Sequence, residues 1–95
     1  MKIIRPPVKD PQGIVKEFDK FYKSKLDGKG VGIFVSSHEI VGKLREEVRE
    51  LETEVFGKGA DIVDRPQRMR DELMDIAVVA LHGVASIDSG KMEVD

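Results

Sequence analysis

Apolar residues recur every three or four positions over three long stretches of this 95-residue chain. This is the spacing of a helix face, and the alternation typical of a strand is almost absent. Because 36% of the residues are charged and 40% are hydrophobic, the chain is neither a disordered polar tail nor a membrane protein. The sequence predicts an all-α fold: one domain over residues 1–95, with three main helices per chain in a helical bundle.

Proline and glycine set the expected bounds of the first helix. Residues 1–9 contain two adjacent prolines and are interpreted as an extended lead-in. Asp10 is a good N-cap and Pro11 fits the first helical position, so the helix begins there and fades near Leu26. The glycine-rich segment 28–32 is interpreted as a flexible connector. A phosphate-binding loop is the alternative, but the Gly-Lys-Ser/Thr ending of the P-loop is missing.

Capping residues set the expected bounds of the other two helices. Ser36 and Glu39 have the spacing of a capping box, so the second helix begins there and runs to about Phe56. Asp64 is the expected N-cap of the third helix. Residues 86–95 form a polar tail, and the sequence leaves three outcomes open for it. The tail frays, extends the third helix or folds over a neighbouring site.

The main apolar stripe of the third helix is formed by Met69, Leu73, Ile76, Ala77, Ala80, Leu81 and Val84. Val78 and Val79 lie off this stripe, so the helix is apolar around its whole circumference between Ile76 and Leu81. A helix that is apolar on all sides is normally buried on all sides. Two further helices of a small chain can hardly cover it. We therefore expect that oligomerisation, as a homodimer or homotetramer, completes the bundle.

The charge balance, the absence of cysteine and the short apolar runs exclude several kinds of partner and metal site. Lysine and arginine total 16 against 18 acidic residues, so there is no electrostatic argument for a nucleic-acid partner. The absence of cysteine excludes disulfides and thiolate metal sites. The longest unbroken apolar run, Ile76–Leu81, is far shorter than the roughly 20 residues that cross a membrane. Met1–Asp10 has no apolar signal region, so we expect a cytoplasmic protein with no membrane partner.

Two acidic pairs carry the strongest chemical signal. Glu47 and Glu50 lie in a Glu-Glu-x-x-Glu pattern, and Glu72 and Asp75 form Glu-x-x-Asp. A spacing of three places each pair on one helix face, beside its apolar stripe. Packing the stripes together brings four carboxylates close, and a divalent cation offsets their repulsion. Oxygen ligands favour Mg²⁺, with Mn²⁺ as the alternative, over Zn²⁺.

Two other interpretations compete with a magnesium site. The first is a solvated charged face, but Asp75 directly precedes the apolar run Ile76–Leu81, where an unpaired acid is costly. The second is a di-iron bundle, which uses Glu-x-x-His on two helices. Neither His38 nor His82 follows a glutamate by three residues. Metal binding by the four carboxylates is the better interpretation.

The segments Lys43–Leu51 and Asp71–Ala77 resemble the two motifs of the MazG-like all-α nucleoside triphosphate pyrophosphatases, in particular their short phage and bacterial members. The resemblance covers about half of the chain, roughly Ser36–Val84. It implies a Mg²⁺-dependent hydrolase, active as a homo-oligomer, that cleaves a (deoxy)nucleoside triphosphate into the monophosphate and pyrophosphate. By position, it implies the metal ligands Glu47, Glu50, Glu72 and Asp75.

The resemblance also implies roles for neighbouring residues. Glu46 matches the first acid of the motif, and we expect it to help activate the attacking water as a catalytic residue. Basic side chains should hold the leaving pyrophosphate, and the substrate-binding candidates are Lys43, Arg68 and Lys91. Larger members of the family have a fourth helix, which this sequence does not predict. A non-catalytic helical interaction module, or a nucleotide sensor that retains the acidic cluster, is therefore the rival hypothesis.

Overall fold

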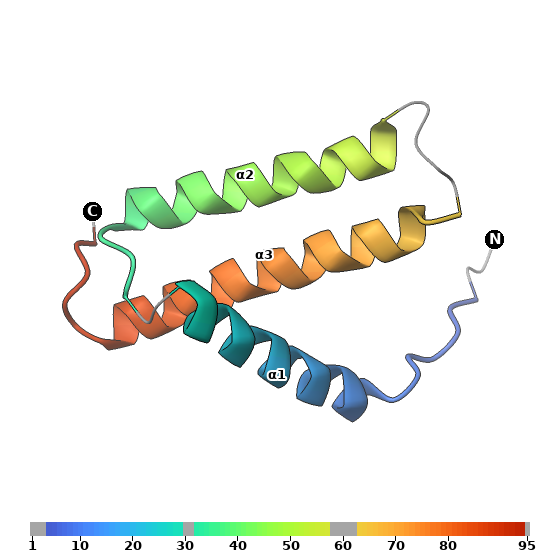
Figure 1. Ribbon diagram of the computed structural model, residues 1–95, viewed down its shortest axis with the longest axis horizontal. Coiled ribbons are helices and arrows are strands. Elements are labelled where there is room, and N and C mark those ends of the chain that lie inside the picture. The colour runs from blue at the N-terminus through green and yellow to red at the C-terminus, as the bar shows by residue number, and fades with distance from the viewer. Residues whose placement is uncertain (1–3, 30–31, 58–62, 95) are drawn as a thin grey trace. The chain divides into compact units, whose positions relative to one another are not determined.

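The computed structural model describes residues 4–29, 32–57 and 63–94. These ranges hold three α-helices and no strand: α1 (Pro11–Lys29), α2 (Ser37–Phe56) and α3 (Arg65–Asp88) (Figure 1). The predicted all-α class is confirmed. The chain divides into two compact units, Met1–Val31 and Gly32–Asp95, so α1 belongs to the first unit and the α2–α3 hairpin to the second.

The first unit contains one helix, which begins where the sequence predicts. Asp10 adopts a positive φ of 43°, and its carboxylate accepts a hydrogen bond from the Gly13 N–H at 3.1 Å. The predicted end near Leu26 is wrong, because α1 continues to Lys29. A glycine inside a helix costs only about 1 kcal/mol, which is too little to end the helix by itself.

Both predicted ends of α2 are confirmed. The Ser36 Oγ accepts a hydrogen bond from the Glu39 N–H at 3.3 Å. The Glu39 carboxylate accepts in return from the Val35 N–H at 2.9 Å, one residue before the N-cap, so the capping box is present in a shifted form. The helix ends at Phe56 because Gly57 turns to extended backbone, where an added side chain would collide with the last turn.

The third helix, α3, begins where the sequence predicts and ends later than predicted. The helix begins at Arg65, with Pro66 in the first turn. The Asp64 side chain makes no capping hydrogen bond, contrary to expectation, and only its carbonyl caps the helix by accepting from the Arg68 N–H at 3.0 Å. At the other end α3 continues to Asp88, so the first three residues of the predicted tail are helical.

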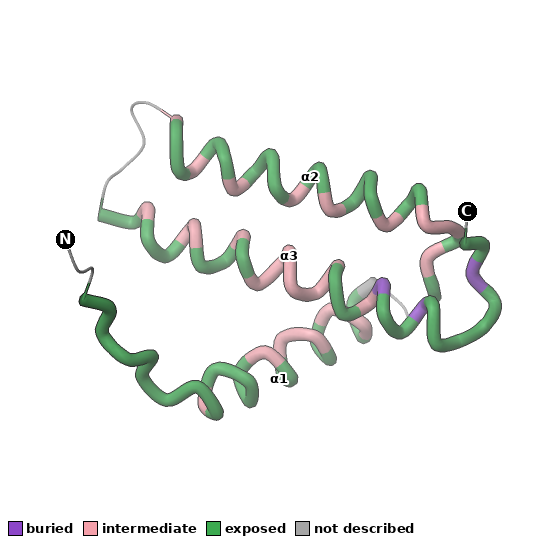
Figure 2. Tube along the Cα trace, turned by 180° about the vertical axis from the view of Figure 1, so that it is seen from behind, coloured by how far each residue is buried: buried purple, intermediate pink, exposed green. Residues whose placement is uncertain are grey.

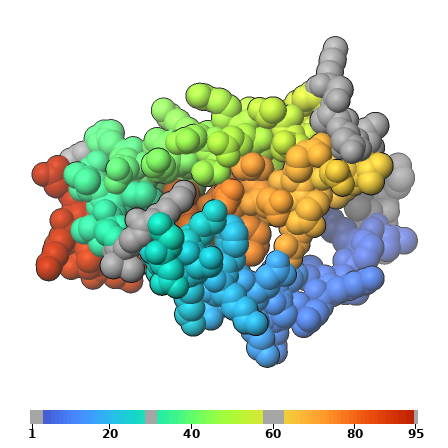
Figure 3. Space-filling model, in the orientation of Figure 1, coloured from blue at the N-terminus to red at the C-terminus, as the bar shows by residue number. Residues whose placement is uncertain are grey.

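The rest of the tail folds back onto the start of α2. The chain turns at Gly90, which has a φ of 71°, and Met92 becomes buried. The Glu93 N–H donates to the Val35 carbonyl at 3.1 Å, and the Ser37 N–H donates to the Glu93 carbonyl at 3.0 Å. In Figure 3 the C-terminal turn accordingly lies against the first residues of α2. The tail thus first extends α3 and then folds over the end of the hairpin that lies opposite its loop. We call this end the open end of the hairpin.

At this open end, a buried serine of α3 forms a hydrogen bond with the segment that precedes α2. Ser86 is fully buried, and its hydroxyl donates to the His82 carbonyl at 2.8 Å while it accepts from the Phe34 N–H at 3.0 Å. His82 Nε2 lies 2.8 Å from the Gly32 carbonyl oxygen, and its ring meets the Phe34 ring edge-on at 4.9 Å. The buried residues of the described chain gather at this end of the hairpin (Figure 2).

The face that α3 turns toward α2 differs from the one the sequence predicts. A Cβ added at Gly83 would lie 3.3 Å from Ile40 Cδ1, so the two helices approach closely there. Leu73 and Val84 of the predicted core stripe are more than half exposed, as is Ile87. The stripe lies roughly 100° around the helix from the face that meets α2. Its exposed members therefore lie outside the core of the hairpin, whereas Met69, Ile76 and Ala77 of the same stripe are half-buried.

Candidate metal centre

Three glutamates converge midway along the α2–α3 hairpin. Glu47 and Glu50 come from successive turns of α2, and Glu72 comes from the facing turn of α3. One carboxylate oxygen of each lies within 4.8 Å of the corresponding oxygens of the other two. The spacing of three puts the two α2 acids on one face, and the antiparallel return of the chain brings the third to them. We call Glu47, Glu50 and Glu72 the glutamate trio.

The trio is only partly solvated. Glu47 and Glu72 are half-buried, whereas Glu50 is exposed. The Oε2 atoms of Glu47 and Glu72 are buried and have no hydrogen-bond partner among the described residues. A buried acceptor without a partner costs roughly 1–3 kcal/mol, and more when it is charged. No lysine or arginine of the described ranges forms an ion pair with the trio.

Burial and the close packing of these carboxylates raise the pKa values of Glu47 and Glu72. Burial is the main cause that raises the pKa of Glu72 to about 7, and it is reinforced by a hydrogen bond with Glu50 and by the charges of Glu50 and Asp75. Burial also raises the pKa of Glu47, with the neighbouring charges of Glu50 and Asp75 adding to it. Each shift shows that a carboxylate is held where its charged form is unfavourable.

Asp75, the fourth predicted ligand, lies beside the trio. It is half-buried and follows Glu72 by three residues on the same side of α3. Its charge raises the pKa of both Glu47 and Glu72, which places it close to them. It does not belong to the set of oxygens within 4.8 Å, so its role as a ligand stays a prediction.

Lys43 and Glu46 lie outside the trio and face each other. The Lys43 Nζ is 3.8 Å from Glu46 Oε2, and both side chains are more than half exposed. Glu46 has only a small effect on the pKa of Glu47, as the last of several causes. The predicted roles in water activation and in phosphate binding both stay predictions.

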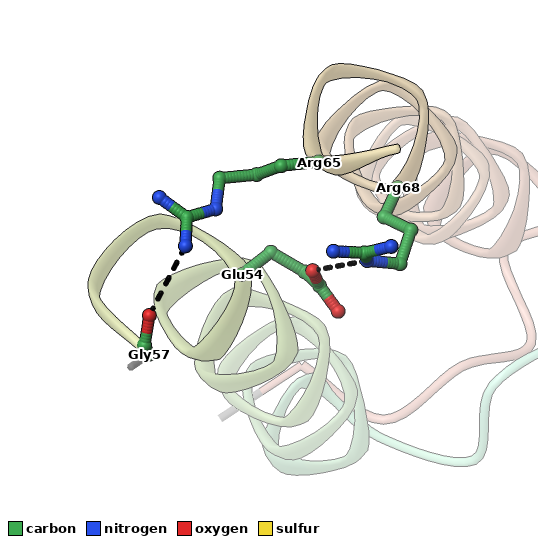
Figure 4. A network of polar contacts seen from close by, with 4 residues as sticks. All are labelled: Glu54, Gly57, Arg65 and Arg68. Atoms are coloured by element: carbon green, nitrogen blue, oxygen red, sulfur yellow. Dashed lines mark hydrogen bonds and ion pairs between the residues drawn. The ribbon is translucent and has the colours of Figure 1, made fainter. Parts of the chain in front are cut away.

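Arg68, a predicted substrate ligand, is bound to an acid that the sequence reasoning missed. Its Nε lies 2.7 Å from Glu54 Oε2, so the ion pair joins α3 to α2 at the loop end of the hairpin (Figure 4). Beside it, Arg65 Nη2 donates to the Gly57 carbonyl at 3.3 Å. Glu54 follows Glu50 by four residues, and this continued helical spacing is the signal that points to it.

Lys91, the third predicted substrate ligand, lies at the open end of the hairpin. Its N–H donates to Ser89 Oγ at 3.2 Å, and its side chain is exposed. The neighbouring Glu93 pairs with the start of α2, which is ~15 Å along the helix axis from Glu47. The structure therefore does not bring Lys91 to the trio of its own chain.

The donor set of the trio suits a hard cation. Three carboxylates offer oxygen atoms only, and their charge is not compensated by an ion pair within the described chain. The glutamate trio can hold a metal ion.

Compared with protein-family models, with curated proteins and with solved structures, the chain matches none. In the described ranges, no helix is long and apolar enough to cross a membrane.

Proposed function

We propose that the chain is a Mg²⁺-dependent nucleoside triphosphate pyrophosphohydrolase, which converts a (deoxy)nucleoside triphosphate and water into the monophosphate and pyrophosphate. The observation that carries this proposal is the glutamate trio, with its two buried and unpartnered oxygens. The reaction itself is inferred from the resemblance of the two acidic motifs to the MazG-like pyrophosphatases.

The trio fits Mg²⁺, with Mn²⁺ as the alternative. Oxygens that share one Mg²⁺ lie at most about 4.2 Å apart, because each bond is about 2.1 Å long. The oxygens of the trio lie within 4.8 Å of one another, so they would have to approach by at most about 0.6 Å to share one ion. Glu47, Glu50 and Glu72 would hold the ion, and Asp75 would join them. When bound, Mg²⁺ supplies positive charge that offsets the charge of the triphosphate.

The side chains around the trio have separate tasks in this proposal. Glu46 is exposed one position before Glu47 and would accept the proton of the attacking water. The water oxygen then bonds to the α-phosphorus, and the bond from that phosphorus to the leaving pyrophosphate breaks. Lys43 is only weakly paired at 3.8 Å and is able to turn toward a phosphate. Arg68 instead positions the helices through its short ion pair with Glu54.

We also propose that the active form is a homo-oligomer, either a dimer or a tetramer. Leu73, Val84 and Ile87 lie on one face of α3, and each is more than half exposed in the single chain. Apolar side chains gathered on one helix face favour burial against another surface.

The direct test is pyrophosphate release from a panel of NTPs and dNTPs, measured with Mg²⁺, with Mn²⁺ and with EDTA. We expect turnover with either metal, none with EDTA, and at least a ~100-fold loss in Glu50→Gln because a charged ligand is removed. Asp88→Asn is the matched control, because it neutralises an exposed acid at the far end of α3. If no nucleotide in the panel is hydrolysed with either metal, the proposal is wrong.

The rival function is a helical interaction module or a nucleotide sensor, and the exposed α3 face favours it. In that case Val84→Asp abolishes assembly while Glu72→Gln has no effect on function. Calorimetry with a non-hydrolysable triphosphate analogue separates the two rivals, because only a sensor binds the analogue and gives a measurable heat of binding. Turnover in the pyrophosphate assay excludes both of them.

A further inference from the structure

The two compact units of the chain carry opposite net charges. Residues 1–31 contain eight basic residues against four acidic ones, whereas residues 32–95 contain eight against fourteen. The first unit therefore has a formal charge of +4 and the second of −6. The balance of the whole chain, which gives no electrostatic argument for a nucleic-acid partner, conceals this division. Such an asymmetry is typical of chains whose basic part binds nucleic acid or a membrane surface.

Three lysines share one side of α1, and we call them the lysine face. Lys16, Lys20 and Lys23 follow one another by four and three residues, so they lie within an arc of ~60°. Lys16 and Lys20 are exposed, and neither forms an ion pair among the residues that the structure describes. The Lys23 Nζ instead lies 2.9 Å from Asp19 Oδ2. Two charges of the lysine face are therefore uncompensated.

The lead-in before α1 adds two more uncompensated charges. Arg5 and Lys9 flank two adjacent prolines, which hold this part of the backbone extended. Both side chains are exposed, and neither forms an ion pair within the described ranges. Together with the two unpaired lysines of α1, they give the first unit four cations without a counter-charge in the described chain.

The apolar side of α1 lies opposite the lysine face. Its large side chains are those of Ile14, Phe18, Phe21 and Tyr22. They are centred ~180° around the helix axis from the lysines. The rings of Phe18 and Tyr22 stack on each other, with their centroids 6.1 Å apart. Any surface that covers the apolar side therefore leaves the lysine face in contact with solvent.

We propose that the lysine face and the basic lead-in bind the phosphate backbone of a nucleic-acid duplex. Lysine binds phosphate as a point charge, and each such contact releases condensed counterions. The aromatic rings lie on the other side of α1 and do not reach the bases, so the binding is independent of base sequence. A membrane surface fits less well, because a helix that lies on lipid buries its apolar side and would direct these lysines away from the headgroups.

The binding is weak and depends strongly on salt. Four cations that each neutralise one phosphate give a slope of about −3.6 when the logarithm of the binding constant is plotted against that of the salt concentration. Affinity should therefore fall roughly 100-fold between about 50 and 200 mM salt. The dissociation constant should be micromolar at the lower concentration, as is typical of contacts to the backbone alone.

The salt dependence of DNA binding tests the proposal. Fluorescence anisotropy of a labelled duplex of ~20 base pairs is measured in EDTA, where the proposed hydrolysis does not occur, so the result is independent of that function. We expect the double variant Lys16→Gln/Lys20→Gln to reduce the slope to about −1.8. Arg5→Gln/Lys9→Gln should have the same effect and lies outside the helices. Arg45→Gln, which removes an exposed charge from the second unit, is the matched control and should keep the natural slope.

Each outcome either supports or overturns the proposal, because circular dichroism checks that every variant is folded. A duplex left unbound by ~100 µM of the natural chain at ~50 mM salt overturns it. A slope that neither double variant reduces, or that the control reduces equally, also overturns it. Vesicles of phosphatidylglycerol are the second probe. Binding to them that is tighter than binding to DNA, and that both double variants retain, would assign the contact to the apolar side of α1 instead.

Discussion

The α2–α3 hairpin compensates the charge of its acidic residues at the loop end and not in the middle. At the loop end, Glu54 meets Arg68 at 2.7 Å, so its charge is compensated by the chain itself. In the middle, Glu47 faces Glu72, and each has a buried oxygen with no hydrogen-bond partner among the described residues. The first arrangement compensates its charge within the chain, whereas the second leaves its charge uncompensated by any ion pair among the described residues.

The difference does not come from helix geometry. Glu54 follows Glu50 by one turn of α2, and Arg68 precedes Glu72 by one turn of α3. The same two faces therefore continue from one site to the other. Only the residue type on α3 changes, from arginine to glutamate, and this single change separates a structural ion pair from a candidate metal centre.

The largest expected effect is on metal-dependent stability. If the trio holds Mg²⁺, an ion concentration of about 100 times the dissociation constant stabilises the fold by ~2.7 kcal/mol. For a chain of this size, that raises the melting temperature by roughly 10–20 °C. Melting followed by circular dichroism, in Mg²⁺ and in EDTA, measures the shift. Glu72→Gln should lose most of it, and an equal shift in this variant would contradict the assignment.

The metal-free protein should show an unusual pH dependence. The pKa of Glu72 is about 7 in the folded chain, against an ordinary value of 4.5. Between these values the folded state binds a proton that the unfolded state has released, so stability falls as the pH rises toward 7. After discounting for solvent, we expect a loss of ~1–2 kcal/mol from pH 5 to pH 8.

Urea unfolding in EDTA at these two pH values tests this dependence. Glu72→Gln cannot release a proton there and should flatten the profile, which isolates the contribution of this one group. A natural chain that is equally stable or more stable at pH 8, with no difference from Glu72→Gln, would show that the trio is well solvated.

Two substitutions should change stability in opposite directions. Arg68→Gln breaks the ion pair at the loop end and leaves Glu54 part-buried without its partner, so we expect a loss of ~1–2 kcal/mol in EDTA. Glu50→Gln removes one of the repelling charges and should stabilise the metal-free chain by a smaller amount. Urea unfolding in EDTA measures both. If both variants were stabilised, or both destabilised, the trio would not differ from the Glu54–Arg68 ion pair in the way described.

The smallest expected effect lies at the open end of the hairpin. Ser86→Ala removes the acceptor of the Phe34 N–H at a fully buried position, which should cost ~1 kcal/mol of unfolding free energy. Ser24→Ala, at an exposed position of α1, is the control. Because this end is far from the trio, the loss should be the same in Mg²⁺ and in EDTA. A loss that depends on the metal would instead connect the two regions.

Signals in the sequence predicted the three helices and named all three members of the glutamate trio. Asp10, Ser36 and Gly57 mark helix ends through capping and backbone preferences that act within a few residues. The pairing of Glu47 with Glu50 follows directly from helical spacing. These features depend on neighbours along the chain, and the sequence contains all that determines them.

Features that depend on a distant partner were not predictable in the same way. The apolar stripe of α3 that includes Leu73 predicted the face toward α2, but the helices approach through Gly83 instead. Periodicity shows which residues share a face and not which face meets a neighbour. Ser86 belongs to the segment that was predicted to be a polar tail. Its hydroxyl is nevertheless buried, and it accepts a hydrogen bond from the backbone N–H of Phe34, which is far away in the sequence.

Manganese binding measured by electron paramagnetic resonance tests the central claim most directly. Free Mn²⁺ gives a signal that diminishes when the ion binds, and Mg²⁺ should compete for the same site. We predict that the natural chain and Asp88→Asn bind Mn²⁺ alike, and that Glu50→Gln binds it at least ~10-fold more weakly. A natural chain that leaves the Mn²⁺ signal unchanged, or a Glu50→Gln variant that binds as well, would contradict the account.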